Sequence, residues 1–384
     1  MVMKKIYLDY ASLTPLDRKV EKEMKKWNKK GPLNPSSIHR SGVEAKKALE
    51  QGRAMTASFL SAHADEIIFT SGGTEANGLA LEGALRTAHR DGYAKPNLII
   101  SAIEHSSIIS LVQMLEKQGV DVTRLPVNEK GMISISDLKK ALKPETCMVS
   151  IMMVNNEIGT VEDIREIAKT IRHTRKNGSV YPLFHTDACQ SALYYDLNVQ
   201  KLGVDLLTLD GNKIYGPRGM GILYVKRGTP IEPIIYGGGQ ENGMRAGTEN
   251  IPGVMGFAKS LHIAAEVREK ESARLFELKK YFATELQKIH PDIKINGDLE
   301  KGAPHILNIS IPNIDSEFFV LQLDAKGIEC STKSACLRDE DESYVLKAIG
   351  VDSKKSVRFS FGRGTSKGEL KKVIGIIKRI LGNK

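Results

Sequence analysis

Lys213 and Asp187 are two residues whose types and surroundings fit the chemistry of an organic cofactor. Lys213 lies in Leu-Asp-Gly-Asn-Lys-Ile-Tyr-Gly-Pro-Arg-Gly, between two predicted strands, and Asp187 ends the preceding apolar run. A lysine amine can form an imine with an aldehyde, and a carboxylate can keep a pyridine nitrogen protonated, which makes the ring an electron sink. Together they indicate a pyridoxal phosphate site, although a lone lysine after a strand is usually a surface residue.

The segment 70–77, Thr-Ser-Gly-Gly-Thr-Glu-Ala-Asn, follows a predicted strand and opens a predicted helix. Backbone N–H groups and the helix dipole at such a start attract a phosphate, and glycine permits its close approach. Gly73 and Thr74 are therefore candidate phosphate ligands. The segment matches neither a P-loop nor a dinucleotide-binding fingerprint, and a plain tight turn is the alternative interpretation.

Histidines near two strand ends are further candidates. His105 ends the run Ile-Ile-Ser-Ala-Ile-Glu-His and could stack on a flat cofactor and move protons, or it could be a structural histidine. His185, Asp187 and Cys189 alternate, so they would share one face of a strand and could hold a metal. No fourth ligand is apparent nearby in the sequence, and we expect no metal.

Cys336 is a candidate nucleophile among the four cysteines. An exposed thiol near Lys333 and Arg338 ionises more readily, whereas the acids at 339–342 oppose this, and Cys330 is a rival six positions away. None of the cysteines forms a C-x-x-C pair, which favours a reduced, cytoplasmic chain over a disulfide-stapled one.

Arg358 lies between apolar neighbours in Ser-Val-Arg-Phe-Ser-Phe, a predicted strand. A partly buried guanidinium requires an anion. From the position alone, that anion could equally be a structural Asp or Glu or the carboxylate of a substrate.

The elements that would position these residues alternate between strand and helix from about residue 60 to 225. The predicted strands are Glu66–Thr70, Asn97–Ile103, Cys147–Val154, Pro182–His185, Leu206–Leu209 and Gly221–Val225. The predicted helices include Glu75–His89, Ser107–Lys117, Ile135–Leu142 and Ile164–Arg175. This alternation predicts an α/β fold with a mostly parallel sheet covered by helices, which binds ligands beyond the carboxyl ends of its strands.

The rest of the chain predicts a smaller α+β C-terminal domain. A Gly-rich loop over 236–250 precedes a helix from Ile251 to about Ile289, and strands follow near His305–Ile311 and Ser356–Ser360. The last segment opens with a capping box, Ser366 to Glu369, and continues with an apolar stripe typical of core packing rather than of a membrane-surface helix.

We therefore expect two domains. Residues 14–258 would form a large cofactor-binding domain, and residues 1–13 with 259–384 would form a small domain that carries the cysteine loop.

The bulk properties exclude some classes of protein. The chain of 384 residues has no apolar run long enough to span a membrane, and its start lacks the apolar region of a signal peptide. Its net charge of +10 could mark nucleic-acid binding, but the lysines are scattered over helical segments such as 21–30 and 367–384. A solvated face is the simpler interpretation, and it could still favour an acidic protein or a tRNA.

Together these motifs resemble the cysteine desulfurases of the class V aminotransferase group, fold type I pyridoxal phosphate enzymes. The similarity runs through Tyr-Leu-Asp-Tyr-Ala (7–11), Asn-Pro-Ser-Ser-Ile-His (34–39), Val-Asn-Asn-Glu-Ile-Gly (154–159), the lysine motif, and Ser-Ala-Cys (334–336). The cysteine loop followed by Ser-Tyr-Val-Leu is similar to the iron–sulfur-assembly branch.

The resemblance implies a role for each matching residue. Lys213 would hold the cofactor and remove the substrate Cα proton, and Cys336 would attack the substrate sulfur to give a persulfide and L-alanine. His105 would stack on the ring and assist proton transfer. The other implied ligands bind the pyridine nitrogen, the ring hydroxyl, the phosphate or the substrate carboxylate: Asp187, Gln190, Gly73, Thr74, Asn212, Thr248, Asn156 and Arg358. Because Thr248 would reach the phosphate of the other subunit, the resemblance also implies a homodimer.

Three features depart from the family pattern. Asp210 and Asn212 stand where the family commonly has serine and histidine, Lys333 replaces a usual glycine, and the stretch from Cys336 to Ser343 is shorter. Asp210 could turn away from the phosphate or face it at a cost in repulsion. We expect it to turn away, because Asn212, Thr248 and the start of a helix still offer donors to the phosphate.

The sequence therefore predicts a cytoplasmic, homodimeric, pyridoxal-phosphate-dependent cysteine desulfurase that acts on L-cysteine. Its sulfur acceptor would be an iron–sulfur scaffold or a tRNA-thiolation protein, and neither a membrane nor a nucleic acid is an expected partner. A selenocysteine lyase or an aminotransferase on the same fold is the nearest alternative, and a non-catalytic sulfur-carrier scaffold is an alternative from another class.

Overall fold

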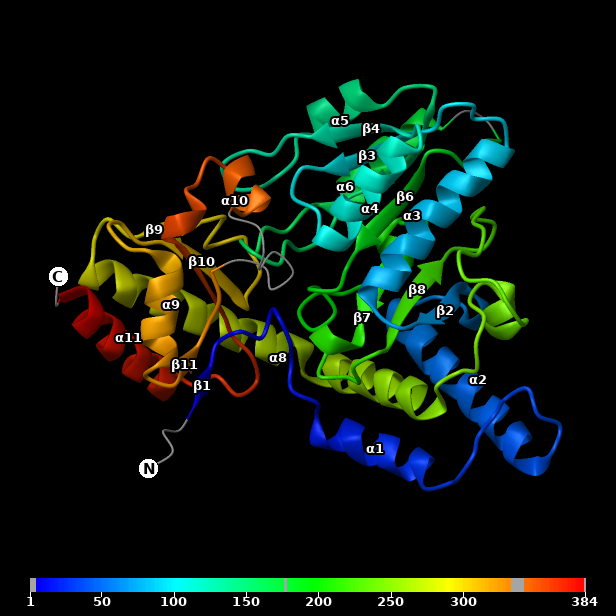
Figure 1. Cartoon of the computed structure of the whole chain (residues 1–384), viewed down its shortest axis with the longest axis horizontal. Coiled ribbons are helices and arrows are strands. Elements are labelled where there is room, and N and C mark those ends of the chain that lie inside the picture. Colours follow the sequence, from blue (N-terminus) through cyan, green and yellow to red (C-terminus); the bar gives the residue numbers. More distant parts are fainter. Residues whose placement is uncertain (1–4, 176–177, 333–341, 383–384) are drawn as a thin grey trace.

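The computed structural model of the chain describes residues 5–175, 178–332 and 342–382. These residues form a large region around a seven-stranded sheet and a smaller region around a three-stranded sheet, and helix α8 runs along both (Figure 1). The fold class predicted from the sequence is confirmed.

The large sheet is almost entirely parallel. In spatial order its strands are β2 (Ile67–Thr70), β8 (Gly221–Val225), β7 (Leu206–Asp210), β6 (Leu183–Asp187), β5 (Thr146–Ser150), β3 (Asn97–Ser101) and β4 (Asp121–Leu125). Only β8 runs against its neighbours, β2 and β7, within this sheet. The carboxyl ends of the parallel strands therefore meet along one edge, which is where ligands bind in sheets of this kind.

Helices cover both faces of the large sheet because side chains alternate along its strands. On β2, Ile68 packs in the cluster that contains helices α3 (Gly73–Arg90) and α4 (Ser106–Lys117), whereas Ile67 and Phe69 pack in the opposite cluster. The helices that contribute to that opposite cluster include α1 (Arg18–Asn28), α2 (Arg40–Leu60), α5 (Ile135–Ala141), α6 (Ile164–Thr174) and α7 (Val199–Leu202).

The smaller region has its own core. Its antiparallel sheet has the order β12 (Ser356–Ser360), β10 (Ile306–Ser310), β9 (Lys294–Asn296), and β1 (Ile6–Tyr7) pairs with β11 (Ile328–Glu329) beside it. Helices α9 (Ser316–Asp324) and α11 (Lys367–Gly382) pack in the same core, whereas α10 (Tyr344–Ala348) packs with Ile103 and Ile158 of the large region. Short 3-10 helices complete the description: η1 (Ala64–Glu66), η2 (Gly211–Lys213), η3 (Gln240–Gly243) and η5 (Ser353–Lys355).

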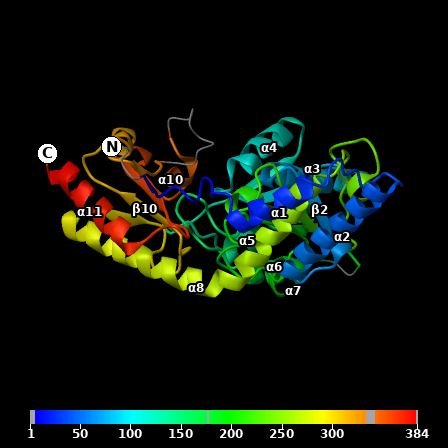
Figure 2. The ribbon, with the colours of Figure 1, turned by 90° about the horizontal axis from the view of Figure 1, so that it is seen from below.

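Helix α8 (Ile251–Ile289) joins the two regions, as the view from below makes plain (Figure 2). Its 39 residues span about 58 Å at the rise of an α-helix. Phe257 packs in the core of the large region, and Phe282 packs in the core of the small region. A single rigid element thus fixes the small region beside the carboxyl edge of the large sheet.

Several local predictions are confirmed. Ser366 and Glu369 form the predicted capping box, since the Glu369 amide donates to Ser366 Oγ and the Ser366 amide donates to Glu369 Oε2. The apolar stripe of α11 packs into the small core through Val373 and Ile377. Within the described part of the chain, no helix is both long and apolar enough to cross a membrane.

Strand β4 was not predicted, and its composition explains why. It lies at the edge of the sheet and reads Asp-Val-Thr-Arg-Leu, and only its last residue is buried. An edge strand that is half exposed need not be apolar, so its sequence lacks the signal that identified the central strands.

Candidate active site

A cavity at the carboxyl ends of the parallel strands gathers most of the predicted site residues. It encloses about 600 Å³, part of it open to solvent, and lies between the large sheet and the small region. The predicted residues that line it are Gly73, Thr74, His105, Asn156, Asp187, Gln190, Lys213 and Arg358. Asn212 and Thr248 are absent from its lining, and the predicted nucleophile Cys336 lies outside the described residues.

Lys213 reaches the cavity from η2, directly after β7. Its Nζ donates to the carbonyl oxygens of Ala11 at 3.0 Å and Ser12 at 2.5 Å. The N-terminal segment, which comes before the first strand of the large sheet in the chain, therefore crosses the site and holds the amine inside the cavity.

Asp187 is the last residue of β6, and its carboxylate is 5% exposed. Its Oδ2 accepts from Asn77 Nδ2 at 2.8 Å, and its Oδ1 accepts from the Cys189 amide at 2.9 Å. Each carboxylate oxygen has a second lone pair, so the group can also accept from the N–H of a protonated pyridine. Asn77 received no role from the sequence, although its place one turn after Gly73 in α3 puts both on one helix face.

His105 is the N-cap residue of α4. Its Nδ1 accepts from the Ser107 amide at 3.2 Å, so the neutral ring carries its proton on Nε2. The same nitrogen lies 2.9 Å from Ser107 Oγ. The ring is thus held in one orientation against the cavity, which suits stacking on a planar group.

Gln190 is oriented by a partner that the sequence did not identify. Its Nε2 donates to the Ala11 carbonyl at 2.8 Å, and its Oε1 lies 3.1 Å from Nε2 of His305. Burial lowers the pKa of His305 well below its usual value, so the neutral ring donates from Nε2 to the glutamine. His305 also stacks on Tyr194, with ring centroids 4.0 Å apart.

Arg358 has a structural acid as well as a place in the cavity. The guanidinium is 1% exposed, and it donates to Asp9 Oδ1 at 2.8 Å and to the Asn156 carbonyl at 2.9 Å. Both alternatives from the sequence therefore bear on this residue. A guanidinium has five N–H groups, so two bonds leave it able to bind a further anion.

Asp210 does not turn away, contrary to our expectation. It is the last residue of β7, and its Oδ2 accepts from the Gly73 amide at the start of α3, at 3.1 Å. Its Oδ1 accepts from the Asn212 amide at 2.7 Å. The first N–H groups of a helix have no intrahelical partner and favour negative charge, so they attract this neighbouring carboxylate.

Thr248 and Asn212 do not line this cavity. Thr248 lines a separate pocket with Glu241 and Arg245, so its reach into a second subunit stays a prediction. The Asn212 carbonyl accepts from Thr14 Oγ1, and its Oδ1 is buried without a partner among the described residues.

The cysteines that the structure describes are Cys147, which is buried, and Cys189 and Cys330, which are partly buried. Burial raises the pKa of Cys330 and of Cys147, and it also raises that of Cys189, which lines the cavity.

The residues considered for a metal site have other partners or are not grouped. The two ring nitrogens of His185 lie within hydrogen-bond distance of the hydroxyl groups of Ser150 and Thr208. In the described ranges, no three His, Cys, Asp or Glu side chains are grouped so that they could hold a metal ion.

Comparison with known proteins gives concordant results. The Aminotransferase class-V family matches residues 6–373. The chain is 42% identical over 382 residues to cysteine desulfurase IscS of Dictyoglomus turgidum, covering 98% of this chain and 95% of that protein. It is 37% identical over 384 residues to cysteine desulfurase IscS of Clostridium botulinum, covering 98% and 94%.

Solved structures agree with these relatives. A NifS-like protein superposes with a TM-score of 0.92 at 30% identity, over 99% of this chain and all (100%) of that chain. A structure described as SspA in complex with cysteine superposes with a TM-score of 0.79 at 31% identity, over 93% of this chain and 99% of that chain.

Proposed function

Because this chain belongs to the class-V aminotransferase family and is a pyridoxal-phosphate-dependent cysteine desulfurase, we propose that the cavity around Lys213 and Asp187 is its active site. The enzyme converts L-cysteine to L-alanine and passes the sulfur to one of its own cysteines as a persulfide. The observation that carries the assignment is that the Lys213 amine and the Asp187 carboxylate open into one cavity at the carboxyl edge of the sheet.

The residues of the cavity fit the cofactor. Asp187 is a buried acceptor for the pyridine N–H, the amide of Gln190 is available to the ring hydroxyl, and His105 offers a flat face. Gly73 and Thr74 at the start of α3 would meet the phosphate. When bound, pyridoxal phosphate withdraws electrons from the substrate Cα.

Lys213 is the group that moves the Cα proton. Its amine is held by the carbonyls of Ala11 and Ser12, which lie on the wall of the same cavity. These two acceptors keep the amine inside the site rather than in solvent, and the same carbonyls can receive it again when it carries a proton.

Arg358 and Asn156 bind the substrate carboxylate. The Asp9 carboxylate and the Asn156 carbonyl fix the plane of the guanidinium, so little side-chain entropy is lost when it binds an anion. Asp9 is therefore a positioning residue in this proposal, and Arg358 makes the contact.

Cys336 is the nucleophile in our proposal. The described residues that flank its segment are themselves fixed: Ser331 pairs with Arg358 through two backbone hydrogen bonds, and Ser343 Oγ donates to Glu157 Oε2 at 2.6 Å. In the step itself, Cys336 Sγ forms a bond to the substrate sulfur and the Cβ–S bond breaks. The electron pair of that bond goes to Cβ, which takes up a proton to give alanine.

We also propose that the chain has two domains. Residues 14–258 are the cofactor-binding domain, and residues 1–13 with 259–384 are the small domain.

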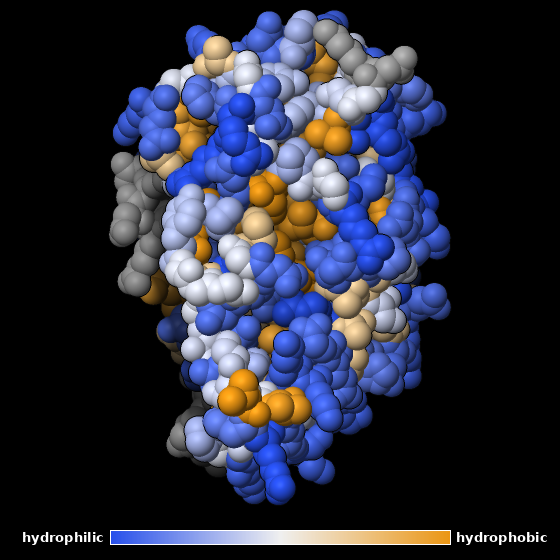
Figure 3. All heavy atoms as spheres, turned by 90° about the vertical axis from the view of Figure 1, so that its right-hand side faces the viewer, coloured by the Kyte–Doolittle hydropathy of each residue, from blue (hydrophilic) through white to orange (hydrophobic). Residues whose placement is uncertain are grey.

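We further propose that the functional unit is a homodimer in which Thr248 completes the partner's site. In support, large apolar side chains are exposed near this loop and at the start of α2, namely Ile235, Tyr236, Ile38 and Val43. The face in Figure 3 carries apolar patches within a mostly hydrophilic surface.

The sulfur of the persulfide passes to an acceptor protein in our proposal. Relatives named IscS are cysteine desulfurases, and we propose that this enzyme acts in the cytoplasm on an acceptor protein, either an iron–sulfur scaffold or a tRNA-thiolation protein. The chain's net charge of +10 favours an acceptor with an acidic surface.

The test is incubation of the purified enzyme with L-cysteine and a reductant, measuring alanine and sulfide together. We expect equal amounts of both. Cys336→Ala should release almost no alanine, whereas the matched variant Cys330→Ala should keep most of the activity because its thiol is largely buried and has a raised pKa. An amino-group transfer without sulfide would assign the chain to the aminotransferases instead.

A further inference from the structure

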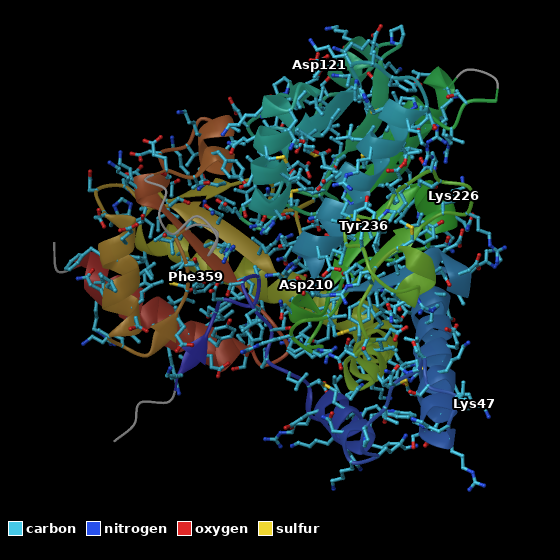
Figure 4. All side chains as sticks on the ribbon, turned by 45° about the vertical axis from the view of Figure 1, so that its right-hand side comes forward. Lys47, Asp121, Asp210, Lys226, Tyr236 and Phe359 are labelled. Atoms are coloured by element: carbon cyan, nitrogen blue, oxygen red, sulfur yellow. The ribbon has the colours of Figure 1, made fainter. Side chains whose placement is uncertain are left out.

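The start of α3 is capped by a side chain from another strand. The N-cap residue is Gly72, which has no side chain, and the Gly73 amide donates instead to Asp210 Oδ2 at 3.1 Å. Figure 4 shows Asp210 near the centre of the molecule, between the large sheet and the small region. A carboxylate of the protein therefore occupies the position at which the start of a helix binds an anion.

Close packing fixes this arrangement. A Cβ at Gly221 would lie 2.7 Å from the Cα of Gly72, so β8 presses directly against the turn that opens α3. A Cβ at Gly73 would lie 2.9 Å from Cys189 Sγ and 3.3 Å from Asp210 Oδ2. The start of α3 is thus packed against β8, against Cys189 and against Asp210. The Asp210 carboxylate can move away from it only by giving up the hydrogen bond from the Gly73 amide.

A second carboxylate lies at the same helix start. Glu75 Oε2 accepts from the Ser71 amide at 3.0 Å, and Glu75 Oε1 accepts from Arg245 Nε at 2.9 Å. The Arg245 guanidinium is thus paired with Glu75. The carboxylates of Asp210 and Glu75 therefore occupy backbone N–H donors that a phosphate bound at this turn would need. Their negative charge would also repel the phosphate.

We propose that Asp210 determines how strongly the site prefers the phosphate of its cofactor. The inference rests on the proposed function of the cavity. A phosphate reaches the start of α3 only when the carboxylate gives up the Gly73 amide, so binding of the phosphate is weakened. The same carboxylate accepts a hydrogen bond from the hydroxyl of pyridoxal, the form of the cofactor that lacks phosphate. The chain therefore discriminates less between pyridoxal phosphate and pyridoxal than it would with a neutral residue at position 210.

The experiment compares two ligands that share the aldehyde and the ring. Protein stripped of cofactor is titrated with pyridoxal phosphate and with pyridoxal, following the visible absorption of each complex. Asp210→Asn keeps an oxygen acceptor for the Gly73 amide and removes the charge, and Asp210→Ser is a second neutral variant. Asp292→Asn, at an exposed position in the turn after α8, controls for the change in net charge.

We expect Asp210→Asn and Asp210→Ser to bind pyridoxal phosphate about tenfold or more tightly than the native chain. Pyridoxal binding should change by less than about threefold, and Asp292→Asn should match the native chain for both ligands. Inorganic phosphate should also raise the melting temperature of stripped Asp210→Asn more than that of the native protein.

Unchanged affinity of both neutral variants for pyridoxal phosphate would overturn the proposal, as would an equal gain for the two ligands. The phosphate-dependent melting temperature does not involve Lys213, so it tests Asp210 even if the active-site assignment is wrong. Failure of every variant to attach either ligand to Lys213 would instead refute the proposed function.

Discussion

The two ends of the cavity differ in whether carboxylates of the protein already occupy the hydrogen-bond donors that the ligand would use. At the end that would hold the pyridine ring, Asp187 is a carboxylate with two donors, and the neighbouring Glu104 is buried with its pKa raised to about 8. At the phosphate end, Asp210 and Glu75 both accept backbone N–H groups of the turn that opens α3. The ring end is arranged to receive its ligand, whereas the phosphate end already holds an anion of the protein.

In our proposal this difference separates the chemistry of the site from its affinity for the phosphate. Lys213, Asp187 and His105, to which we assign the chemistry, line the same cavity. In the same proposal, Asp210 alters only the strength with which the site holds a phosphate. Variants at the two ends of the cavity should therefore affect different measurements.

Removing the amine should have the largest effect. Lys213→Ala should lower the rate of alanine formation by about 1,000-fold or more, because both covalent attachment and the proton carrier are lost. The rate of alanine release from L-cysteine is the measurement. Lys226→Ala, a lysine just after β8 whose side chain is 49% exposed, is the matched control. A loss of less than tenfold for Lys213→Ala would show that another residue moves the Cα proton.

Glu104 tests how the ring end avoids a second charge. Its Oε1 accepts from Ser101 Oγ and the Met152 amide, and burial is the main reason that its pKa rises from 4.5 to about 8. The folded state keeps a proton that the unfolded state loses above about pH 4.5. The resulting stabilisation is complete below that pH and is lost as the pH rises through about 8.

Glu104→Gln stays neutral, so it should flatten this pH dependence. We expect its free energy of unfolding at pH 8 to exceed that of the native protein by on the order of 3 kcal/mol, and the difference should shrink toward pH 5. Denaturant unfolding at several pH values is the measurement. Parallel pH profiles for the two proteins would mean that Glu104 is ionised in the fold.

Arg358 tests the contact to the substrate carboxylate. Arg358→Lys keeps the charge but loses the planar fork, which costs about 1.5–3 kcal/mol, so cysteine should bind about tenfold or more weakly. Asp9→Asn should give a smaller loss, since it frees the guanidinium without removing it. Cysteine affinity is measured from the spectral change of the cofactor-loaded enzyme. Equal affinity in the native protein and Arg358→Lys would assign Arg358 to Asp9 alone.

His305 should show the smallest effect. His305→Phe keeps a ring to stack on Tyr194 but loses the hydrogen bond that orients Gln190. One neutral hydrogen bond contributes about 0.5–1.5 kcal/mol, so cofactor affinity should fall between about twofold and tenfold. The absorption spectrum of the bound cofactor should also shift, because the amide near the ring hydroxyl reorients. A spectrum and an affinity identical to those of the native protein would remove His305 from the site.

The central strands and most of the cavity could be predicted because their signals are local. Apolar runs that end in polar residues identified β6 and β7, and with them Asp187 and Lys213. Asp9 and His305 were missed because they reach the site through pairing across the fold: Arg358 bonds Asp9 across 349 positions, and Gln190 lies beside His305 across 115. No sequence pattern encodes such a contact.

The prediction for Asp210 was wrong for a related reason. It weighed the repulsion between a carboxylate and a bound phosphate, and it left the donors at the start of the helix to the phosphate. The structure adds the attraction between that carboxylate and the Gly73 amide, which depends on how closely β7 and β8 approach the start of α3. A local departure from a motif thus acquires its meaning from the packing around it.

The most direct test of the active-site assignment is to locate the lysine that bears the cofactor. The protein loaded with pyridoxal phosphate is reduced with borohydride and digested, and the modified peptide is identified by mass spectrometry. We predict that the label lies on Lys213, the lysine directly before Ile-Tyr-Gly-Pro in the sequence. The variant Lys213→Ala should carry no label. A label on any other lysine of the native protein, or an undiminished label in Lys213→Ala, would contradict the account.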